Sequence, residues 1–113
     1  MTLAKALQIL QKANAIKSPW LSGMRDAERG TRYMTSSNAI WDIDHPDITD
    51  PATKGCLLTL LREASEDNRI YVRQEFSGQR WAVHSPYKSW PVKDTEGEAI
   101  QAALITLAGC YEQ

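Results

Sequence analysis

The segment that decides the fold is Ile70–Ser85, with the sequence IYVRQEFSGQRWAVHS. Its centre, Ser77-Gly78, separates two stretches in which apolar and polar side chains alternate, which is typical of a β-hairpin with a two-residue turn. Such a turn fixes the register of the two strands. The expected pairs are Phe76–Gln79, Glu75–Arg80, Gln74–Trp81 and Val72–Val83.

The two faces of this hairpin differ in chemistry. The inner face is expected to hold Ile70, Val72, Phe76, Trp81 and Val83. The outer face is expected to hold Tyr71, Arg73, Glu75, Arg80 and His84. One apolar and one charged face predict an antiparallel sheet that is covered on one side only. A third strand over Tyr87–Val92 belongs at an edge, because Pro91 has no N–H to donate.

Two capped helices flank the hairpin in the sequence. Asp50 is placed to cap a helix that begins at Pro51. Gly55 lies within its first two turns, which indicates close backbone packing there. A second helix begins at Thr95-Glu96-Gly97-Glu98, which has the spacing of a capping box. The predicted core of these elements is Leu57, Leu60, Leu61, Val72, Trp81, Val83, Ile100, Leu104 and Leu107.

Length and composition fit one domain over residues 1–113. The chain has 42% apolar and 24% charged residues, close to the globular average. A helix over Thr2–Ile16, ended by Ser18-Pro19, has limited apolar area, so segment 1–18 is expected at the periphery of the domain. We predict an α+β fold, a small antiparallel sheet with helices packed on it.

The region between Trp20 and Ile43 is expected to form short strands instead of helices. Glycines and a Ser-Ser-Asn triplet interrupt short stretches that are richer in β-forming residues. The predicted strands here are Met24–Ala27, Tyr33–Thr35 and Ala39–Ile43.

Charge and cysteine content narrow the function classes. Thirteen Lys and Arg residues against fourteen Asp and Glu residues give a net charge of −1. This balance argues against a broad DNA-binding surface and also against a DNA mimic. Cys56 and Cys110 lie among small and apolar residues, so both are expected in the core as free thiols. No membrane-spanning run or secretion signal is evident, which predicts a cytoplasmic protein.

Three motifs together resemble a known group of proteins. They are DPATKGCLLTLLREA at Asp50–Ala64, TEGEAIQAAL at Thr95–Leu104 and WLSGMR at Trp20–Arg25. With the hairpin's Trp-x-Val, this set resembles small proteins of tailed-phage and prophage genomes. Here Ser22 replaces a proline of that pattern and Gly97 interrupts the start of the last helix. The resemblance implies a bacterial host cell, and it assigns no mechanism and no functional residue.

Neither a metal site nor a catalytic site is expected from the polar residues. The acidic loop Asp42, Asp44, His45, Asp47 and Asp50 departs from a calcium-loop pattern, since Pro46 and Thr53 occupy ligand positions. Acidic residues before a helix are typical of a solvated capping loop. His45 and His84 have no partner at metal-ligand spacing, and no nucleophile–base pair is recognisable. We predict a protein that is not an enzyme and needs no cofactor.

Binding to another protein is the favoured function. Trp20, Trp41 and Trp90 lie beside loops or at a sheet edge, and Tyr33 lies near the first two. Half-exposed aromatic rings often anchor protein interfaces, so these four residues are the candidate partner-binding residues. The expected partner is a host or phage protein. The alternative is a small nucleic-acid-binding regulator that uses the outer face of the 70–85 hairpin.

Overall fold

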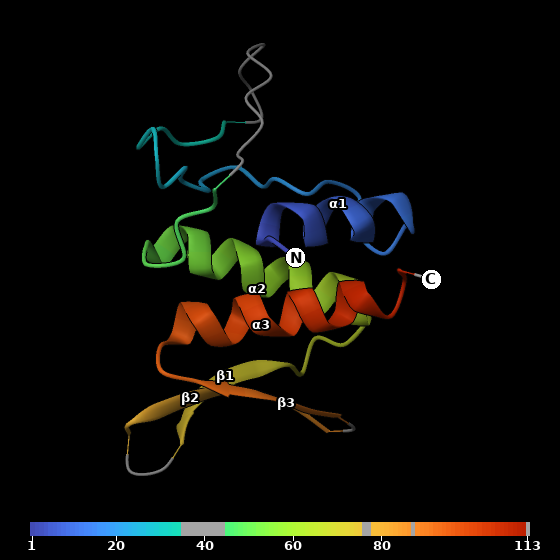
Figure 1. Ribbon diagram of the computed structural model, residues 1–113, viewed down its shortest axis with the longest axis vertical. Helices are drawn as coiled ribbons and strands as arrows, with labels where there is room; N and C mark the ends of the chain where they lie inside the picture. Colours follow the sequence, from blue (N-terminus) through green and yellow to red (C-terminus); the bar gives the residue numbers. More distant parts are fainter. Residues whose placement is uncertain (35–44, 76–77, 87, 113) are drawn as a thin grey trace.

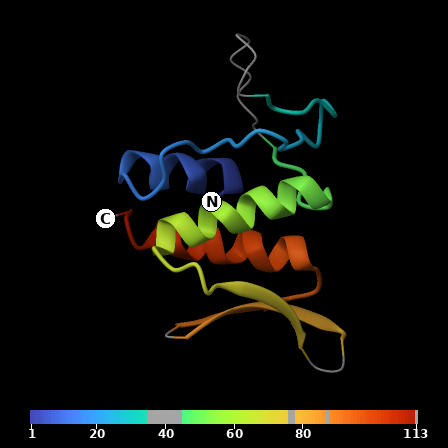
Figure 2. The same ribbon diagram turned by 180° about the vertical axis from the view of Figure 1, so that it is seen from behind.

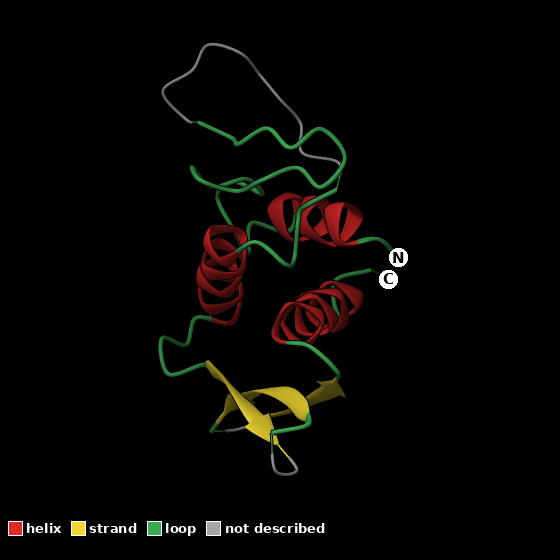
Figure 3. Ribbon diagram, turned by 90° about the vertical axis from the view of Figure 1, so that its left-hand side faces the viewer, coloured by secondary structure: helices red, strands yellow, loops and turns green. Residues whose placement is uncertain are grey.

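The computed structural model describes residues 1–34, 45–75, 78–86 and 88–112. Three helices and three strands follow in the order α1 (Leu3–Lys12), α2 (Pro51–Ser65), β1 (Tyr71–Glu75), β2 (Arg80–Ser85), β3 (Lys88–Lys93) and α3 (Glu96–Gly109). All three helices lie on one side of an antiparallel sheet with strand order β1-β2-β3 (Figures 1 and 3). The predicted α+β fold is therefore confirmed.

Helix α3 is the centre of the molecule. It packs on all three strands and also on α1 and α2. Figures 1 and 2 show α2 and α3 as a layer between the sheet and α1. The sheet thus has one face against α3 and its other face open to solvent, as the alternation in the hairpin predicted.

The predicted hairpin register is confirmed. Val72 pairs with Val83, Gln74 with Trp81 and Glu75 with Arg80. The expected Phe76–Gln79 pair includes a position outside the described residues. The third strand is β3, which lies at an edge and contains Pro91.

The core includes α1, which was expected to lie outside it, and does not include Trp81, which was predicted to be part of it. Leu3, Leu7 and Leu10 of α1 are buried in the same cluster as α2 and α3, so the expectation of a peripheral first helix is wrong. The reason is that α3 offers α1 a complementary apolar face. Trp81, in contrast, is only half-buried and lies outside that cluster, because it sits near the hairpin turn opposite the exposed Gln74 and Lys93. Of the other predicted core residues, Leu57, Leu60, Leu61, Val83, Ile100 and Leu104 are buried, whereas Val72 and Leu107 are partly buried against the cluster.

Both predicted caps, Asp50 and Thr95, form, and Thr2 caps α1 in the same way. The side chains of Thr2, Asp50 and Thr95 accept hydrogen bonds from the backbone N–H three residues later. Helix α1 nevertheless ends at Lys12, earlier than proline alone would end it, because Asn14 adopts a left-handed conformation with φ of 61°. Asparagine tolerates this conformation better than most residues.

The region after Trp20 forms less regular structure than predicted. Met24–Ala27 is not a strand but contributes two isolated bridges, Arg25 with Arg32 and Asp26 with Pro46. Tyr33 and Met34 are not in a strand either, and residue 35 and the predicted strand Ala39–Ile43 lie outside the described residues. Isolated backbone hydrogen bonds, such as the one from Tyr33 N–H to the Met24 carbonyl, and side-chain bonds from Arg25 and Arg32 hold this region in place of a sheet.

Candidate functional site

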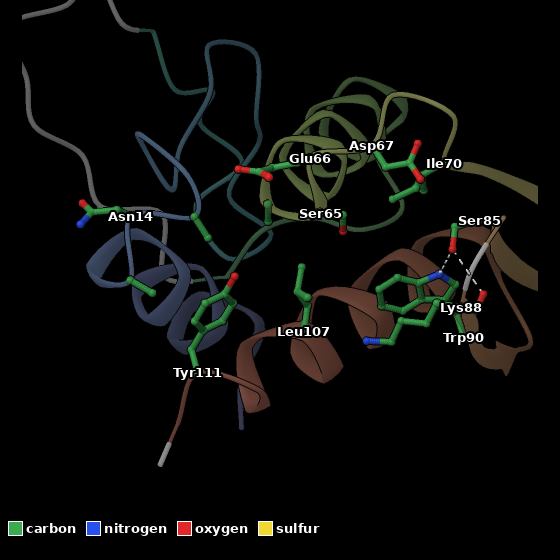
Figure 4. A pocket seen from close by; sticks show the side chains of 13 residues that line it. Asn14, Ser65, Glu66, Asp67, Ile70, Ser85, Lys88, Trp90, Leu107 and Tyr111 are labelled. Atoms are coloured by element: carbon green, nitrogen blue, oxygen red, sulfur yellow. Dashed lines mark hydrogen bonds between the residues drawn. The ribbon is translucent and has the colours of Figure 1, made fainter.

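A pocket of about 560 Å³ lies where the C-terminal ends of the three helices meet the β2–β3 hairpin (Figure 4). Its size falls within the range of sites that bind small molecules or single side chains. Each helix ends here for a local reason. Asn14 turns the chain left-handed after α1, Glu66 does the same after α2 with φ of 53°, and α3 ends at Gly109.

One wall of the pocket is apolar and aromatic. It is formed by Leu107, Tyr111 and Trp90, while Ile70 lies beside Asp67 on the α2 side (Figure 4). The Trp90 indole Nε1 donates a hydrogen bond to Ser85 Oγ at 3.1 Å, which fixes the orientation of the ring. The ammonium of Lys88 lies 4.4 Å from the centre of that ring, within the range of a cation–π contact.

The opposite wall contains a buried hydroxyl without a partner. Ser65 Oγ is inaccessible to solvent, and within the described part of the chain it is the one buried side-chain oxygen or nitrogen that lacks a hydrogen bond. Ser65 is also the last residue of α2 and lines the pocket. Buried polar atoms are nearly always hydrogen-bonded, and leaving one unpaired costs about 1–3 kcal/mol. Because this oxygen is inaccessible to solvent, it is closed off from the open space of the pocket.

Negative charge dominates the α2 side of the pocket. Glu66 and Asp67 follow Ser65 directly, and Figure 4 shows them on the side away from Lys88 and Trp90. The Arg69 side chain hydrogen-bonds to Asp67 and holds the pKa of that carboxyl below its usual value. Within the described residues, Glu66 has no ion-pair partner. The C-terminal ends of three helices add partial negative charge to the same place.

The structure does not provide the expected surface of half-exposed tryptophans. Trp20 and Trp90 are buried in the core cluster, 7% and 8% exposed. Tyr33 is half-buried against the same cluster. Trp41 lies outside the described residues. Of the three predicted residues that the structure describes, Trp90 lines the pocket and Trp20 and Tyr33 do not.

The acidic loop is instead an ion-paired structural element. Arg32 donates two hydrogen bonds of 2.8 Å to the carboxylate of Asp50, the cap of α2, and Arg25 donates one of 3.0 Å to Asp47. The bonds from Arg32 are the main reason why the pKa of Asp50 lies well below its usual value. These arginine partners could not be found from sequence spacing, since 18 and 22 residues separate them from the acids.

The described residues of this loop do not form a cluster of side chains that could bind a metal ion. No cluster of three His, Cys, Asp or Glu side chains there has the geometry to hold an ion. Asp42 and Asp44 lie outside those residues. His45 pairs with Glu28 at 3.4 Å, while His84 pairs with Glu75 on the sheet, so the two histidines have separate partners.

The outer face of the sheet is paired internally. Arg73 and His84 both contact the carboxylate of Glu75, and these two contacts lower its pKa, His84 contributing most. The Tyr71 ring stacks on the His84 ring with centroids 5.5 Å apart. The basic and aromatic groups proposed for nucleic-acid binding are thus largely engaged with one another.

The two cysteines differ in environment. Cys56 is half-buried, and this burial raises the pKa of its thiol. Cys110 is exposed, so the expectation that it lies in the core is wrong. It follows the last residue of α3 and is the C-cap of that helix, a position at which the apolar stripe has already ended.

The pocket itself is not evident from the sequence. Ser65–Asn68 indicates the end of a helix, and Tyr111 fits a helical apolar face, but neither pattern shows that three helix ends converge. Asn14 and Glu66 give no clear signal, because the left-handed conformation of a non-glycine residue is rarely predictable.

Comparison with known proteins reveals no relative of this chain. No protein-family model matches the chain, and neither a curated protein nor a solved structure shows significant similarity to it. Within the described residues, no helix combines the length and apolar character that crossing a membrane requires.

Proposed function

We propose that this chain is a non-enzymatic binding protein that accepts a group of a partner protein in the pocket between the helix C-termini. The observation that carries the proposal is the pocket itself, about 560 Å³ in volume and lined by Trp90, Leu107 and Tyr111. The aromatic wall at Trp90 and Tyr111 offers the apolar contact area that typically anchors such a group.

The motifs at Asp50–Ala64 and Thr95–Leu104 support a biological context for this binding. Their resemblance to proteins of tailed-phage and prophage genomes favours an accessory protein that acts in the cytoplasm of a bacterial host. The partner is then a host or phage protein, and inhibition of host defence or other host machinery is the role we favour. This part of the proposal is an argument by analogy, separate from the pocket geometry.

Affinity capture from a bacterial host lysate tests the proposal, followed by binding measurements with the purified partner. Leu107→Trp adds bulk within the pocket, whereas Leu58→Trp adds the same bulk at a half-buried site outside it. Both variants must first be shown to unfold cooperatively. We expect Leu107→Trp to lose the partner and Leu58→Trp to retain it.

A third variant distinguishes the pocket from the surface near Trp20. Tyr33→Ala removes a half-buried ring of that region without touching the pocket. Loss of the partner in Tyr33→Ala, together with full binding by Leu107→Trp, would show that the contact surface lies there and that the pocket is not used.

A further inference from the structure

We infer that the free edge of strand β1 pairs with the same edge of a second copy of this chain, so that the two sheets join into one. The inference goes beyond the proposed function and does not depend on the pocket. Three features of β1 support it: an open edge, the lack of residues that protect such an edge, and a charge pattern that is complementary to itself.

Strand β1 has a neighbouring strand on one side only. It pairs with β2 along one edge, and α3 packs on one of its faces. Within the described residues, no backbone hydrogen bond reaches β1 from any segment other than β2. Figures 2 and 3 show no helix or strand beside its other edge. Alternate residues of such a strand direct their N–H and C=O groups outward, where they can bond to the backbone of another strand.

The opposite edge of the sheet is protected, whereas the edge of β1 is not. Strand β3 contains Pro91, which has no N–H to donate, and the exposed Lys88 and Lys93. Proline and lysine are typical means by which proteins prevent edge-to-edge pairing. Strand β1 contains neither. Its charged residues, Arg73 and Glu75, have opposite signs and lie 3.2 Å apart, so they do not repel a second copy as two lysines would.

The charge pattern of β1 selects the register of the pair. In a two-fold antiparallel arrangement centred on Gln74, Arg73 of each copy lies opposite Glu75 of the other, which gives two ion pairs across the junction. An arrangement centred on Arg73 would place like charges opposite each other. One centred on Val72 would place Arg73 opposite Tyr71. Of these three registers, the one centred on Gln74 is the one with complementary charges.

A second copy fits this edge better than a strand of an unrelated protein. The two-fold axis repeats the contact between Arg73 and Glu75, so one pattern on one strand supplies both ion pairs. Gln74 is exposed and would lie opposite itself on the axis. Its amide has both donors and an acceptor, so two copies of this side chain can bond to each other. An unrelated strand would need a glutamate and an arginine in the matching positions.

Analytical ultracentrifugation of the full chain, from micromolar to millimolar concentration, tests the dimer. We expect a monomer–dimer equilibrium that moves towards the monomer at high salt, because exposed ion pairs are screened. Arg73→Glu and Glu75→Arg should each weaken dimerisation by about ten-fold, since each replaces two ion pairs by two like-charge contacts. Lys93→Glu, on the opposite edge, is the matched control and should change little. An equimolar mixture of Arg73→Glu and Glu75→Arg should associate again, which a loss of folding could not produce.

Cysteine substitution along β1 tests the register. The background carries Cys56→Ser and Cys110→Ser, so that the introduced thiol is the one that reacts. Gln74→Cys should form a disulfide between two copies under mild oxidation, because residues opposite each other in an antiparallel pair lie within the Cα separation that a disulfide spans. Val72→Cys and Arg73→Cys would lie on the axis of the other two registers, and they should form this disulfide much more slowly.

Three results would each overturn the inference: a monomer at millimolar concentration, a dimer that the charge variants leave unchanged, or fastest crosslinking in Val72→Cys or Arg73→Cys. If the chain alone stays monomeric while a captured partner protein shifts the NMR amide signals of β1, the edge binds a strand of that partner and not a second copy. The capture experiment with Leu107→Trp tests the pocket separately, because that substitution lies in α3 and not in β1.

Discussion

The backbone carbonyl of Ile48 occupies the space where residue 97 would carry a side chain. A Cβ built on Gly97 would lie 2.0 Å from that oxygen, far inside any real contact. Gly97 is buried in the first turn of α3, while Ile48 lies in the loop before α2. The absence of a side chain at position 97 therefore allows α3 to approach this loop.

Gly97→Ala is expected to destabilise the protein, because a backbone carbonyl cannot move aside as a flexible side chain can. Overpacking typically costs about 1–3 kcal/mol, and this contact belongs at or above the upper end of that range. The measurement is the free energy of unfolding in urea. Gly55→Ala is the matched control: position 55 is open, contrary to the expectation of close packing there, and alanine should stabilise α2 by roughly 1 kcal/mol. Equal effects of the two substitutions would contradict this account.

Truncation of a buried leucine should lower the free energy of unfolding as much in α1 as in α2. Leu7 and Leu61 are both fully buried in one cluster. We expect Leu7→Ala and Leu61→Ala each to lower the free energy of unfolding by about 2–5 kcal/mol. If Leu7→Ala left the melting temperature unchanged, α1 would be peripheral after all.

Removal of the Ser65 hydroxyl should stabilise the protein. Ser65→Ala eliminates an unpaired buried oxygen, with an expected gain of about 1–3 kcal/mol. Thr59→Ala, on the same helix, removes an exposed hydroxyl that donates to Gly55 and controls for the change in helix propensity. A Ser65→Ala variant that is less stable than the parent would show that the hydroxyl has a structural partner.

Stability should fall in acid through the carboxylates of the 26–50 region. Hydrogen bonds lower the pKa of Asp26, Asp47 and Asp50, chiefly from the Arg29 backbone, the Thr49 side chain and the Arg32 side chain respectively. A carboxyl whose pKa is lower when folded contributes stability above its unfolded pKa, near 4, and loses it as pH decreases below that value.

The urea midpoint should therefore decrease steadily as the pH is lowered from 5 towards 2. Arg32→Gln removes the main cause of the low pKa of Asp50 and should make this decrease shallower. A pH dependence identical to that of the parent would mean that the Arg32–Asp50 pair contributes nothing to acid sensitivity.

The two thiols should react at very different rates in the native state. Cys110 is exposed and should be labelled rapidly by a thiol reagent at neutral pH. Cys56 is half-buried with a raised pKa, which lowers the fraction of reactive thiolate. Labelling of Cys110→Ser and Cys56→Ser variants separates the two rates, and faster reaction at Cys56 would contradict the structure.

Local signals explain what the sequence predicts correctly. The cap at Asp50, the capping position at Thr95 and the turn at Ser77-Gly78 each depend on neighbours within a few residues. The hairpin register follows from the turn, and the α+β fold follows from the hairpin and its flanking helices.

The errors have a common cause, which is dependence on partners distant in the chain. The burial of α1 requires the face of α3, which the first sixteen residues do not reveal. Alternation assigns Trp81 to the inner face, but only the length of helix above it decides whether it is covered. The pocket likewise depends on where three separate helices end, and the ion pairs of Arg25 and Arg32 depend on how an irregular region folds back.

The packing of α1 on α3 has a consequence for synthesis of the chain. Helix α1 cannot reach its final position until the face of α3 on which it packs has been made and has left the ribosome. At about 5–20 residues per second, translation of the intervening chain takes roughly 5–20 s. During that interval the first helix carries an uncovered apolar stripe, so the nascent protein is open to chaperones and to aggregation until its last helix emerges.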